Sequence, residues 1–520
     1  MRLFVIAAAF MAALVPQVQA QTFATEDPVL RRIWTLGMDS SHIYRLAQTL
    51  TDSIGPRLTG SPEQKAAHDW AVKQYQQWGI AARNEQYGTW RGWRRGHTHV
   101  DLIAPRVRTL EGTMLAWSPG TNGNVEAPVI LLPEANDSGA LAAWLPQARG
   151  RFVAISFAEP TCRPNRQMQE FAPSTQWWDR FRADRDSARV RYNRRVNAMA
   201  RSANNLRTQL EAAGARGILQ SQWSQDYGVN KIFGTNTERI PTIDLSCEDY
   251  GLVYRLAQNN QGPVVRVNAA AQFTGTVPTW NTIAEIKGRE KPNEYVMLSA
   301  HFDSWEASSG ATDNATGTVT MMEAMRILKQ VYPNPKRTIL VGHWSGEEQG
   351  LNGSRAFAKD HPEIVNGLQA LFNQDNGTGR VQNISAQGLV GAGAHLATWL
   401  SRIPSEITQH IRLTVPGSPG GGGSDYASFI CAGAPAFSLG SLDWGYGTYT
   451  WHTNRDTFDK IVIDEVKNNA VLTAMLVYLA SEDPQRVPRD RRTVMARSQF
   501  SGQLQNWPTC QDGARAAPAN

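Results

Sequence analysis

The sequence predicts an α/β protein in which a mixed, mostly parallel sheet is flanked by helices and interrupted by an inserted β-rich domain. After Asn281, short apolar strands alternate with amphipathic helices, a pattern typical of a parallel sheet. Residues 118–275 differ, with short strands around one long charged helical stretch. The chain has 520 residues, 41% of them hydrophobic, so it is long enough for several domains with cores of their own.

Composition and charge exclude several classes of protein. With 19% charged residues and 43 glycines, the chain is neither an extended disordered protein nor a collagen-like repeat. The net charge of +6 is small for this length. The charged stretch at 176–213 carries both signs, so a solvated helix explains it better than a nucleic-acid site. We therefore expect no nucleic-acid partner.

The N-terminus is typical of a secretory signal peptide over residues 1–20. Arg2 precedes an apolar run, and Val18-Gln19-Ala20 has the small-x-small pattern that precedes cleavage. The run is too short to cross a bilayer, and no later stretch is long and apolar enough. We expect an exported, periplasmic or extracellular protein that begins at Gln21 and has no membrane span.

Four cysteines remain after this cleavage: Cys162, Cys247, Cys431 and Cys510. No C-x-x-C occurs, which argues against a structural zinc knuckle or a thioredoxin-like site. Export and the even count predict at least one disulfide. The pairing stays open, because four cysteines allow three arrangements.

Residues 21–117 form the N-terminal part of the main domain and begin with helices. Asp27-Pro28 can start the first helix, and Ser61-Pro62-Glu63-Gln64 is a capping box for a later one. Apolar side chains follow this box at helical spacing: Ala67, Trp70, Ala71, Tyr75 and Trp78. Two strands are expected near 86–90 and 99–104.

The rest of the chain divides at about residue 276. The inserted domain, 118–275, has expected strands at 129–132, 152–157, 218–221 and 241–245. The main domain resumes over 276–490, with expected strands at 295–300, 338–342 and 368–372 and a helix at 316–330. Residues 491–520 are a C-terminal tail. In such sheets, ligands bind beyond the carboxyl ends of the strands.

Five potential metal ligands stand at those strand ends or in the loops that follow: His301, Asp313, Glu348, Asp375 and His452. Imidazole and carboxylate together suit zinc and similar ions. Each residue alone has an ordinary structural explanation, such as a helix cap for Asp313. Together, these groups at one sheet edge would repel and desolvate one another unless cations held them.

Around these residues the sequence resembles the zinc-dependent exopeptidases with two co-catalytic metals, which include bacterial aminopeptidases, carboxypeptidase Q and glutamate carboxypeptidases. The matching stretches, in the family's order and spacing, are 300–304, 310–314, 346–354, 375–377 and 452–457. The resemblance covers about 276–480 closely and implies the zinc exopeptidase fold. The inserted segment resembles the protease-associated domain of larger members.

The resemblance also implies two Zn²⁺ per chain and a role for each residue. The expected ligands are His301, Asp313 and Asp375 for one ion, and Asp313, Glu348 and His452 for the other. Glu347 is the expected general base for a water shared by the two ions. Asp303 is expected to accept the N–H of the His301 imidazole and fix its tautomer. The family has a cis peptide bond after the bridging aspartate, so we expect one at Asp313–Asn314.

The activity implied is hydrolysis of terminal peptide bonds in a peptide or dipeptide substrate. An aminopeptidase is favoured as the commoner activity, with a carboxypeptidase Q-like carboxypeptidase or dipeptidase as the alternative. A glutaminyl cyclase, a related single-zinc acyltransferase, and an inactive receptor-like homologue are less well supported. The receptor-like branch has lost metal ligands, whereas this chain keeps all five and the base. The sequence does not decide which peptide end is cleaved or the oligomeric state.

One stretch departs from the single-domain aminopeptidases, which place a tyrosine near the oxyanion shortly before a Ser-Asp-His segment. Here it reads Gly420-Gly421-Gly422-Gly423-Ser424-Asp425-Tyr426, which fits carboxypeptidase Q-like members better. The glycines are no phosphate loop, because no Gly-Lys-Ser/Thr follows. We expect them to let the backbone approach substrate closely.

Other candidate residues are weaker. No G-x-S-x-G occurs, which argues against an α/β-hydrolase serine. His97 and His99 share a strand face without a carboxylate motif, and His343 lies within a strand as a core histidine does. Trp305 and Trp451 lie close in sequence to expected ligands and are candidates for shaping a substrate pocket.

Overall fold

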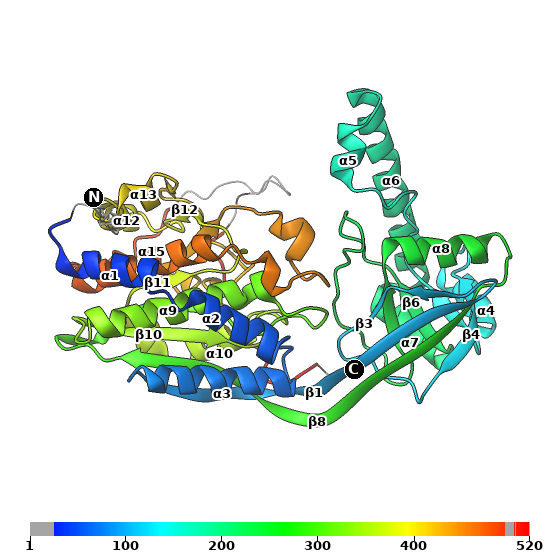
Figure 1. The fold of residues 1–520 in the computed structure, drawn as a ribbon, viewed down its shortest axis with the longest axis horizontal. Helices are drawn as coiled ribbons and strands as arrows, with labels where there is room; N and C mark the ends of the chain where they lie inside the picture. The colour runs from blue at the N-terminus through cyan, green and yellow to red at the C-terminus, as the bar shows by residue number, and fades with distance from the viewer. Residues whose placement is uncertain (1–24, 494–503, 505, 519–520) are drawn as a thin grey trace, which may run out of the picture.

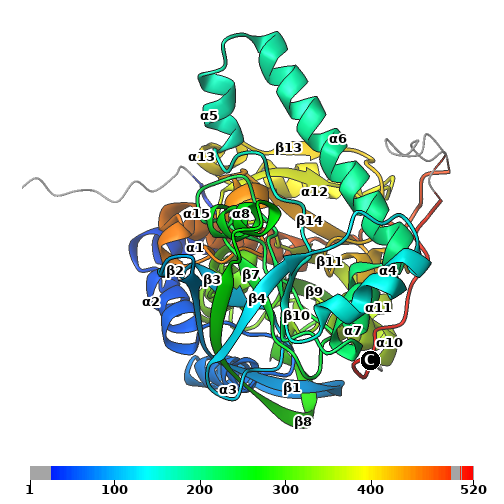
Figure 2. The ribbon, with the colours of Figure 1, turned by 90° about the vertical axis from the view of Figure 1, so that its right-hand side faces the viewer.

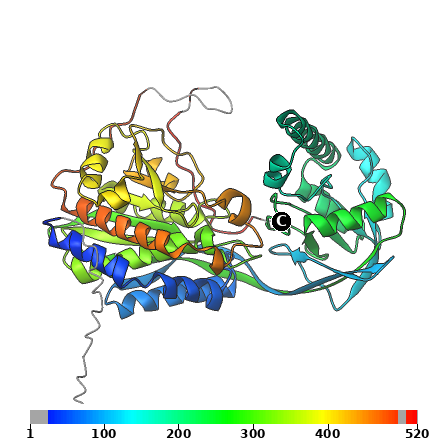
Figure 3. The same ribbon diagram turned by 45° about the horizontal axis from the view of Figure 1, so that its top comes forward.

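The computed structural model describes residues 25–493, 504 and 506–518 and shows two lobes joined by a long two-stranded ribbon (Figure 1). The expected signal peptide lies outside the described residues. Figure 3 shows the lobes side by side with the ribbon between them. In the described part of the chain, no helix is long and apolar enough to cross a membrane.

One sheet of 14 strands, counted over the described residues, runs through both lobes in the order β13-β12-β14-β11-β9-β10-β8-β4-β5-β6-β7-β3, with β1 paired to β8 and β2 to β1. The strands are β1 (Ala81–Ala104), β2 (Arg108–Leu110), β3 (Gly112–Met114), β4 (Val125–Leu131), β5 (Phe152–Ala154), β6 (Gly217–Gln220), β7 (Thr242–Leu245), β8 (Val264–Ile286), β9 (Lys291–His301), β10 (Arg337–Trp344), β11 (Leu368–Asn373), β12 (Val381–Ser385), β13 (Arg412–Thr414) and β14 (Ala436–Ser441).

The main lobe is the mixed, mostly parallel sheet that the sequence predicts. Strands β10, β9, β11 and β14 are parallel, whereas β8 and β12 pair antiparallel at either side. Helices cover both faces of this sheet (Figure 1). Those of the main lobe are α1 (Pro28–Asp39), α2 (Ile43–Gln48), α3 (Pro62–Gln77), α9 (Thr316–Val331), α10 (Asn352–Asp360), α11 (Pro362–Gly367), α12 (Ala392–Leu400), α13 (Ser405–Thr408), α14 (Ala427–Ile430) and α15 (Ile463–Glu482).

The helix signals in the sequence are confirmed. Asp27 caps α1, because its side chain accepts the amide protons of Val29 and Leu30. Ser61 caps α3 through the Gln64 amide. Helix α9 spans the expected residues and is buried along most of its length, since α1, α2 and α15 cover it from outside.

The ribbon differs from the sequence prediction. The two strands expected near 86–90 and 99–104 are one strand, β1, which pairs antiparallel with β8 along its whole length. Bulges between Gly92 and Trp93 and between Arg95 and Thr98 let the ribbon bend without breaking its pairing. The expected domain boundary at 275/276 falls inside β8, because that strand is continuous from one lobe into the other.

The second lobe is an α/β unit rather than the β-rich one expected. Its strands β4, β5, β6 and β7 are parallel, and β3 pairs antiparallel with β7. Its helices are α4 (Ser138–Trp144), α5 (Asn165–Glu170), α6 (Thr175–Ala200), α7 (Ala203–Ala212) and α8 (Cys247–Gln258). Helices α5 and α6 project from the lobe (Figure 2), and the charged stretch at 176–213 forms α6 and α7, as predicted.

Each lobe has its own apolar core, and two disulfides add covalent links. The main core gathers around α9, α15 and the strands between them, whereas two smaller clusters cover the faces of the second-lobe sheet. Cys162 pairs with Cys247 in the second lobe, and Cys431 with Cys510 in the main lobe. The prediction of at least one disulfide is therefore confirmed.

Candidate metal centre

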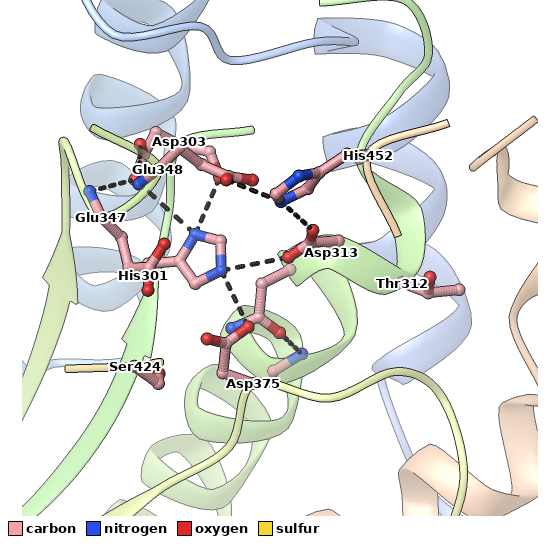
Figure 4. Close-up of polar contacts among 12 residues, drawn as sticks. His301, Asp303, Thr312, Asp313, Glu347, Glu348, Asp375, Ser424 and His452 are labelled. Atoms are coloured by element: carbon pink, nitrogen blue, oxygen red, sulfur yellow. Dashed lines mark hydrogen bonds and ion pairs between the residues drawn. The ribbon is translucent and has the colours of Figure 1, made fainter. Parts of the chain in front are cut away.

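The expected ligands converge at the carboxyl edge of the main sheet (Figure 4). His301 is the last residue of β9, and Asp375 follows β11. Glu348 lies in the turn after β10. Asp313 precedes α9, and His452 comes from the loop before α15. Because the strands are parallel, their ends bring together residues that lie far apart in the sequence.

Asp313 stands between two groups of side chains. Its Oδ1 lies 3.3 Å from His301 Nε2, which is 2.9 Å from Asp375 Oδ1. Its Oδ2 lies 3.2 Å from His452 Nε2, which is 2.8 Å from Glu348 Oε2. Each carboxylate oxygen of Asp313 thus faces one imidazole, the arrangement that a bridging ligand needs.

Asp303 contacts the His301 ring through its main chain. The Nδ1 of His301 lies 3.0 Å from the backbone carbonyl oxygen of Asp303 but 3.6 Å from its carboxylate. The main chain of Asp303 therefore orients the imidazole. Its carboxylate accepts the amide protons of Glu347 and Glu348, each at 3.2 Å, and so holds the turn that carries these two residues.

Glu347 stands beside this cluster without an ion-pair partner among the described residues. Oxygen and nitrogen atoms of His301, Glu347 and Asp375 lie within 4.8 Å of one another. Desolvation raises the pKa of Glu347 well above its ordinary value, while the His301 imidazole opposes this shift and Asp375 adds to it. A carboxylate with a raised pKa next to the cluster suits proton transfer near neutral pH.

Two residues hold the loop between His301 and Asp313, and the sequence analysis assigned neither a role. The buried guanidinium of Arg57 donates to the carbonyl oxygens of Phe302 at 2.7 Å and Gly310 at 2.9 Å. The Asp456 carboxylate accepts the amide protons of Thr312 and Asp313 at 2.8 and 3.0 Å. Asp456 lies within a family-like stretch, whereas no local pattern marks Arg57.

The peptide bond between Asp313 and Asn314 is cis, as expected from the resemblance. The Asn314 side chain donates to the carbonyl of Gln374 at 2.9 Å and accepts the Gly317 amide at 3.0 Å. These contacts tie the start of α9 to the loop that carries Asp375.

Aromatic side chains surround His452. Trp451 stacks on its ring at 3.9 Å between centroids, and Trp305 lies at 6.1 Å. The third ring is Phe233 of the second lobe, edge-on at 5.1 Å. A small cavity beside the ligands is lined by Trp305 and Ser308, whose indole nitrogen and hydroxyl have no hydrogen-bond partner among the described residues. Both expected tryptophans therefore lie at the site.

The glycine-rich stretch reaches the centre through Asp425. Burial raises the pKa of Asp425 to about 7, against the nearby His301 imidazole. A Cβ atom at Gly420 would lie 2.1 Å from the Tyr426 hydroxyl, which explains glycine there. Tyr426 thus packs against its own loop.

The remaining histidines lie away from the ligand cluster. His343 is buried and bonds the Tyr75 hydroxyl at 2.7 Å, as a core histidine does. The rings of His97 and His99 lie 5.5 Å apart on β1, and His97 bonds Asn268.

The chemistry of this donor set fits metal ions. Two imidazoles and three carboxylates meet at this sheet edge. Glu348 contacts His452 through Oε2, while its Oε1 is buried without a hydrogen-bond partner among the described residues. Carboxylates gathered out of water at one place are stabilised by a cation bound between them. Mixed nitrogen and oxygen ligands are those of zinc and its neighbours. Fold and site together define a metal centre at the carboxyl edge of an α/β sheet.

Comparisons with known proteins give similar metallopeptidases. Residues 281–477 match the model of Peptidase family M28. Carboxypeptidase Q of Mus musculus is 24% identical over 454 residues, covering 87% of this chain and 88% of the relative. Among solved structures, a Peptidase M28 precursor from Shewanella amazonensis has a TM-score of 0.63 at 22% identity, covering 88% of this chain and 97% of that one. BSAP, a zinc aminopeptidase from Bacillus subtilis, has a TM-score of 0.55 at 19% identity, covering 86% and 97%. Residues 281–477 of this chain thus match Peptidase family M28, and together with these relatives the match shows a metallopeptidase.

Proposed function

We propose that this chain is an exopeptidase that binds two zinc ions and hydrolyses a terminal peptide bond, with Glu347 as the general base. One observation carries the proposal: Asp313 faces His301 with one carboxylate oxygen and His452 with the other. Such a bridge is the ligand geometry that a pair of ions needs. His301, Asp313 and Asp375 would hold one ion, and Asp313, Glu348 and His452 the other.

In the proposed hydrolysis, some residues transfer protons and others hold the site in place. When bound, zinc supplies a Lewis acid that polarises the scissile carbonyl and makes water a better nucleophile at neutral pH. Glu347 takes the proton of the attacking water and returns a proton to the leaving amine. Asp303 holds the Glu347 amide, and Arg57 and Asp456 hold the loop of Asp313, so that ligands and base keep their positions.

The first candidate activity is that of an aminopeptidase, which removes residues from the amino end of a peptide. It is the commoner activity in the family that the sequence resembles, and BSAP, one of the structural neighbours, is named a zinc aminopeptidase. A carboxypeptidase Q-like carboxypeptidase or dipeptidase is the second candidate. Identity to carboxypeptidase Q over most of both chains favours it, as does the glycine-rich stretch.

The proposal extends to compartment and domains. Residues 1–20 would be a signal peptide for export, and the two disulfides are compatible with an oxidising compartment. The second lobe would correspond to a protease-associated-like insert.

A peptide panel tests activity and direction together. Peptides with free, acetylated or amidated ends are incubated with the mature protein, with and without chelator and added zinc, and the products are identified by mass spectrometry. Shortening from the amino end that acetylation blocks is expected. Shortening from the carboxyl end that amidation blocks, or cleavage confined to free dipeptides, would support the second candidate.

Two outcomes would contradict the proposal. Cleavage that is unaffected by chelation would remove metal from the mechanism. A single bound zinc with cyclisation of N-terminal glutamine instead of cleavage would indicate a glutaminyl cyclase.

A further inference from the structure

A short segment of the second lobe, residues 228–233, lies beside the metal centre, and we term it the docking segment. It lies against the loop of the main lobe that carries His452. Lys231 and Thr453 form an antiparallel bridge, and the Ile232 amide donates to the carbonyl oxygen of His452 itself at 2.8 Å. A residue of one lobe therefore bonds the main chain of a metal ligand in the other.

Asn454 makes three further bonds between the docking segment and the His452 loop. Its amide donates to the Asn230 carbonyl at 3.0 Å, and its side-chain oxygen accepts the Asn230 amide at 2.9 Å. Its side-chain nitrogen donates to the Gly228 carbonyl at 3.0 Å. Lys231 adds three more contacts, because its ammonium donates to the carbonyls of Gly447 and Trp451 and lies 4.0 Å from the centre of the Trp451 ring.

The docking segment is itself held rigidly. Asn230 is 2% exposed, and its side-chain nitrogen donates to Asp244 Oδ1 at 2.5 Å and to the Leu245 carbonyl at 2.7 Å. Asp244 in turn accepts from Gln220 at 3.0 Å, at the end of β6. The position of the segment is therefore set by the second-lobe sheet.

His452 needs such support more than His301 does. A histidine that binds a metal normally donates its other ring nitrogen to a partner that fixes the ring. For His301 that partner is the Asp303 carbonyl. The Nδ1 of His452 is buried and has no hydrogen-bond partner among the described residues. Its ring is held by packing instead, in part against Phe233 of the docking segment.

We propose that the docking segment positions His452 and thereby sets the affinity of the ion held by Glu348 and His452. This inference rests on the proposed two-ion site. Phe233 and Asn454 are the positioning residues, because Phe233 packs on the His452 ring and Asn454 bonds the docking segment. Docking of the two lobes completes one half of the metal centre, whereas the half formed by His301 and Asp375 depends on the main lobe alone.

The test compares zinc binding of Phe233→Ala and Asn454→Ala with that of the wild type. Metal content after dialysis and competition with a chromophoric chelator give the affinity of each ion. We expect one ion to bind about 10–100-fold more weakly and the other to keep its affinity. Asn454→Asp, which keeps the acceptor for the Asn230 amide, should recover part of the loss, and excess zinc should restore turnover.

Phe171→Ala is the matched control, because Phe171 belongs to the same lobe but is 76% exposed. Circular dichroism confirms that each variant is folded. Two ions held with wild-type affinity in both variants would overturn the inference alone. Equal loss of both ions would overturn it too, because the effect would not be specific to the His452 half. A wild type that binds no zinc would overturn the proposed function as well.

Discussion

His301 and His452 have the same side chain and the same expected duty, but the chain supports them differently. His301 bonds a carbonyl two residues away, whereas His452 depends on rings and main-chain bonds from distant segments. The same difference separates the site residues that the sequence could predict from those that it could not. The ligands stand in short stretches with family-like spacing, so the sequence pointed to them. Arg57 and Phe233 act through contacts with residues far along the chain, and no local pattern reveals such contacts.

The substitution Glu347→Gln tests the proposed general base directly. It keeps the size of the side chain but removes the carboxylate that accepts a proton. We expect turnover to fall by about 10²–10⁴-fold, the usual contribution of a general base, while zinc content stays unchanged. Steady-state kinetics and metal analysis on the same sample check this. Glu406→Gln, at an exposed position, is the control, and full activity in Glu347→Gln would exclude Glu347 as the base.

At the scale of elements, α3 and the sheet are joined by buried polar contacts. His68 on α3 bonds Thr282 of β8 and Ser345 after β10, each at 2.7 Å. The sequence predicted α3 from its cap and spacing, because those signals are local. It did not predict β1 as one strand, because the continuity of β1 depends on pairing with β8, which lies far along the chain.

Burial lowers the pKa of His68 to about 3, and that of His343 likewise. In the unfolded chain both histidines have ordinary pKa values near 6.5, so the unfolded state binds more protons as the pH falls. The free energy of unfolding should therefore decrease below about pH 6.5, by up to about 1.4 kcal/mol per pH unit for each histidine. Urea unfolding at pH 7, 6, 5 and 4 measures this slope.

His68→Gln should be less stable than the wild type at pH 7 but less sensitive to acid. His410→Gln, at an exposed position, should keep the wild-type slope. An unchanged slope in His68→Gln would show that His68 does not contribute to acid sensitivity.

At the scale of the whole molecule, the C-terminal segment 506–518 returns to the main lobe and is held there. Cys510 is bonded to Cys431, and the Ala514 amide donates to the Asn352 side chain at 2.8 Å. The Thr89 amide donates to the Arg515 carbonyl at 2.8 Å, so the segment also contacts β1. The sequence left the pairing of cysteines open, because residues 79 apart reveal their proximity only in the fold.

Cys510→Ser should free this segment while leaving the ligand cluster intact. We expect a loss of about 2–4 kcal/mol in the free energy of unfolding, the usual effect of removing a disulfide that closes a long loop. Limited proteolysis should remove the C-terminal segment faster than in the wild type. Equal proteolysis rates would mean that the non-covalent contacts alone hold the segment.

The paired strands β1 and β8 also bear on how such a protein arises. The second lobe leaves and rejoins the main lobe through neighbouring residues, since Gly92 lies opposite Gly275. An insertion whose two ends are already adjacent adds little loop-closure entropy to the host, whatever its length. The ribbon is thus a site at which a domain can be inserted or replaced during evolution without a change in the main-lobe sheet. By the same reasoning, a lobe acquired there becomes indispensable once it comes to hold His452.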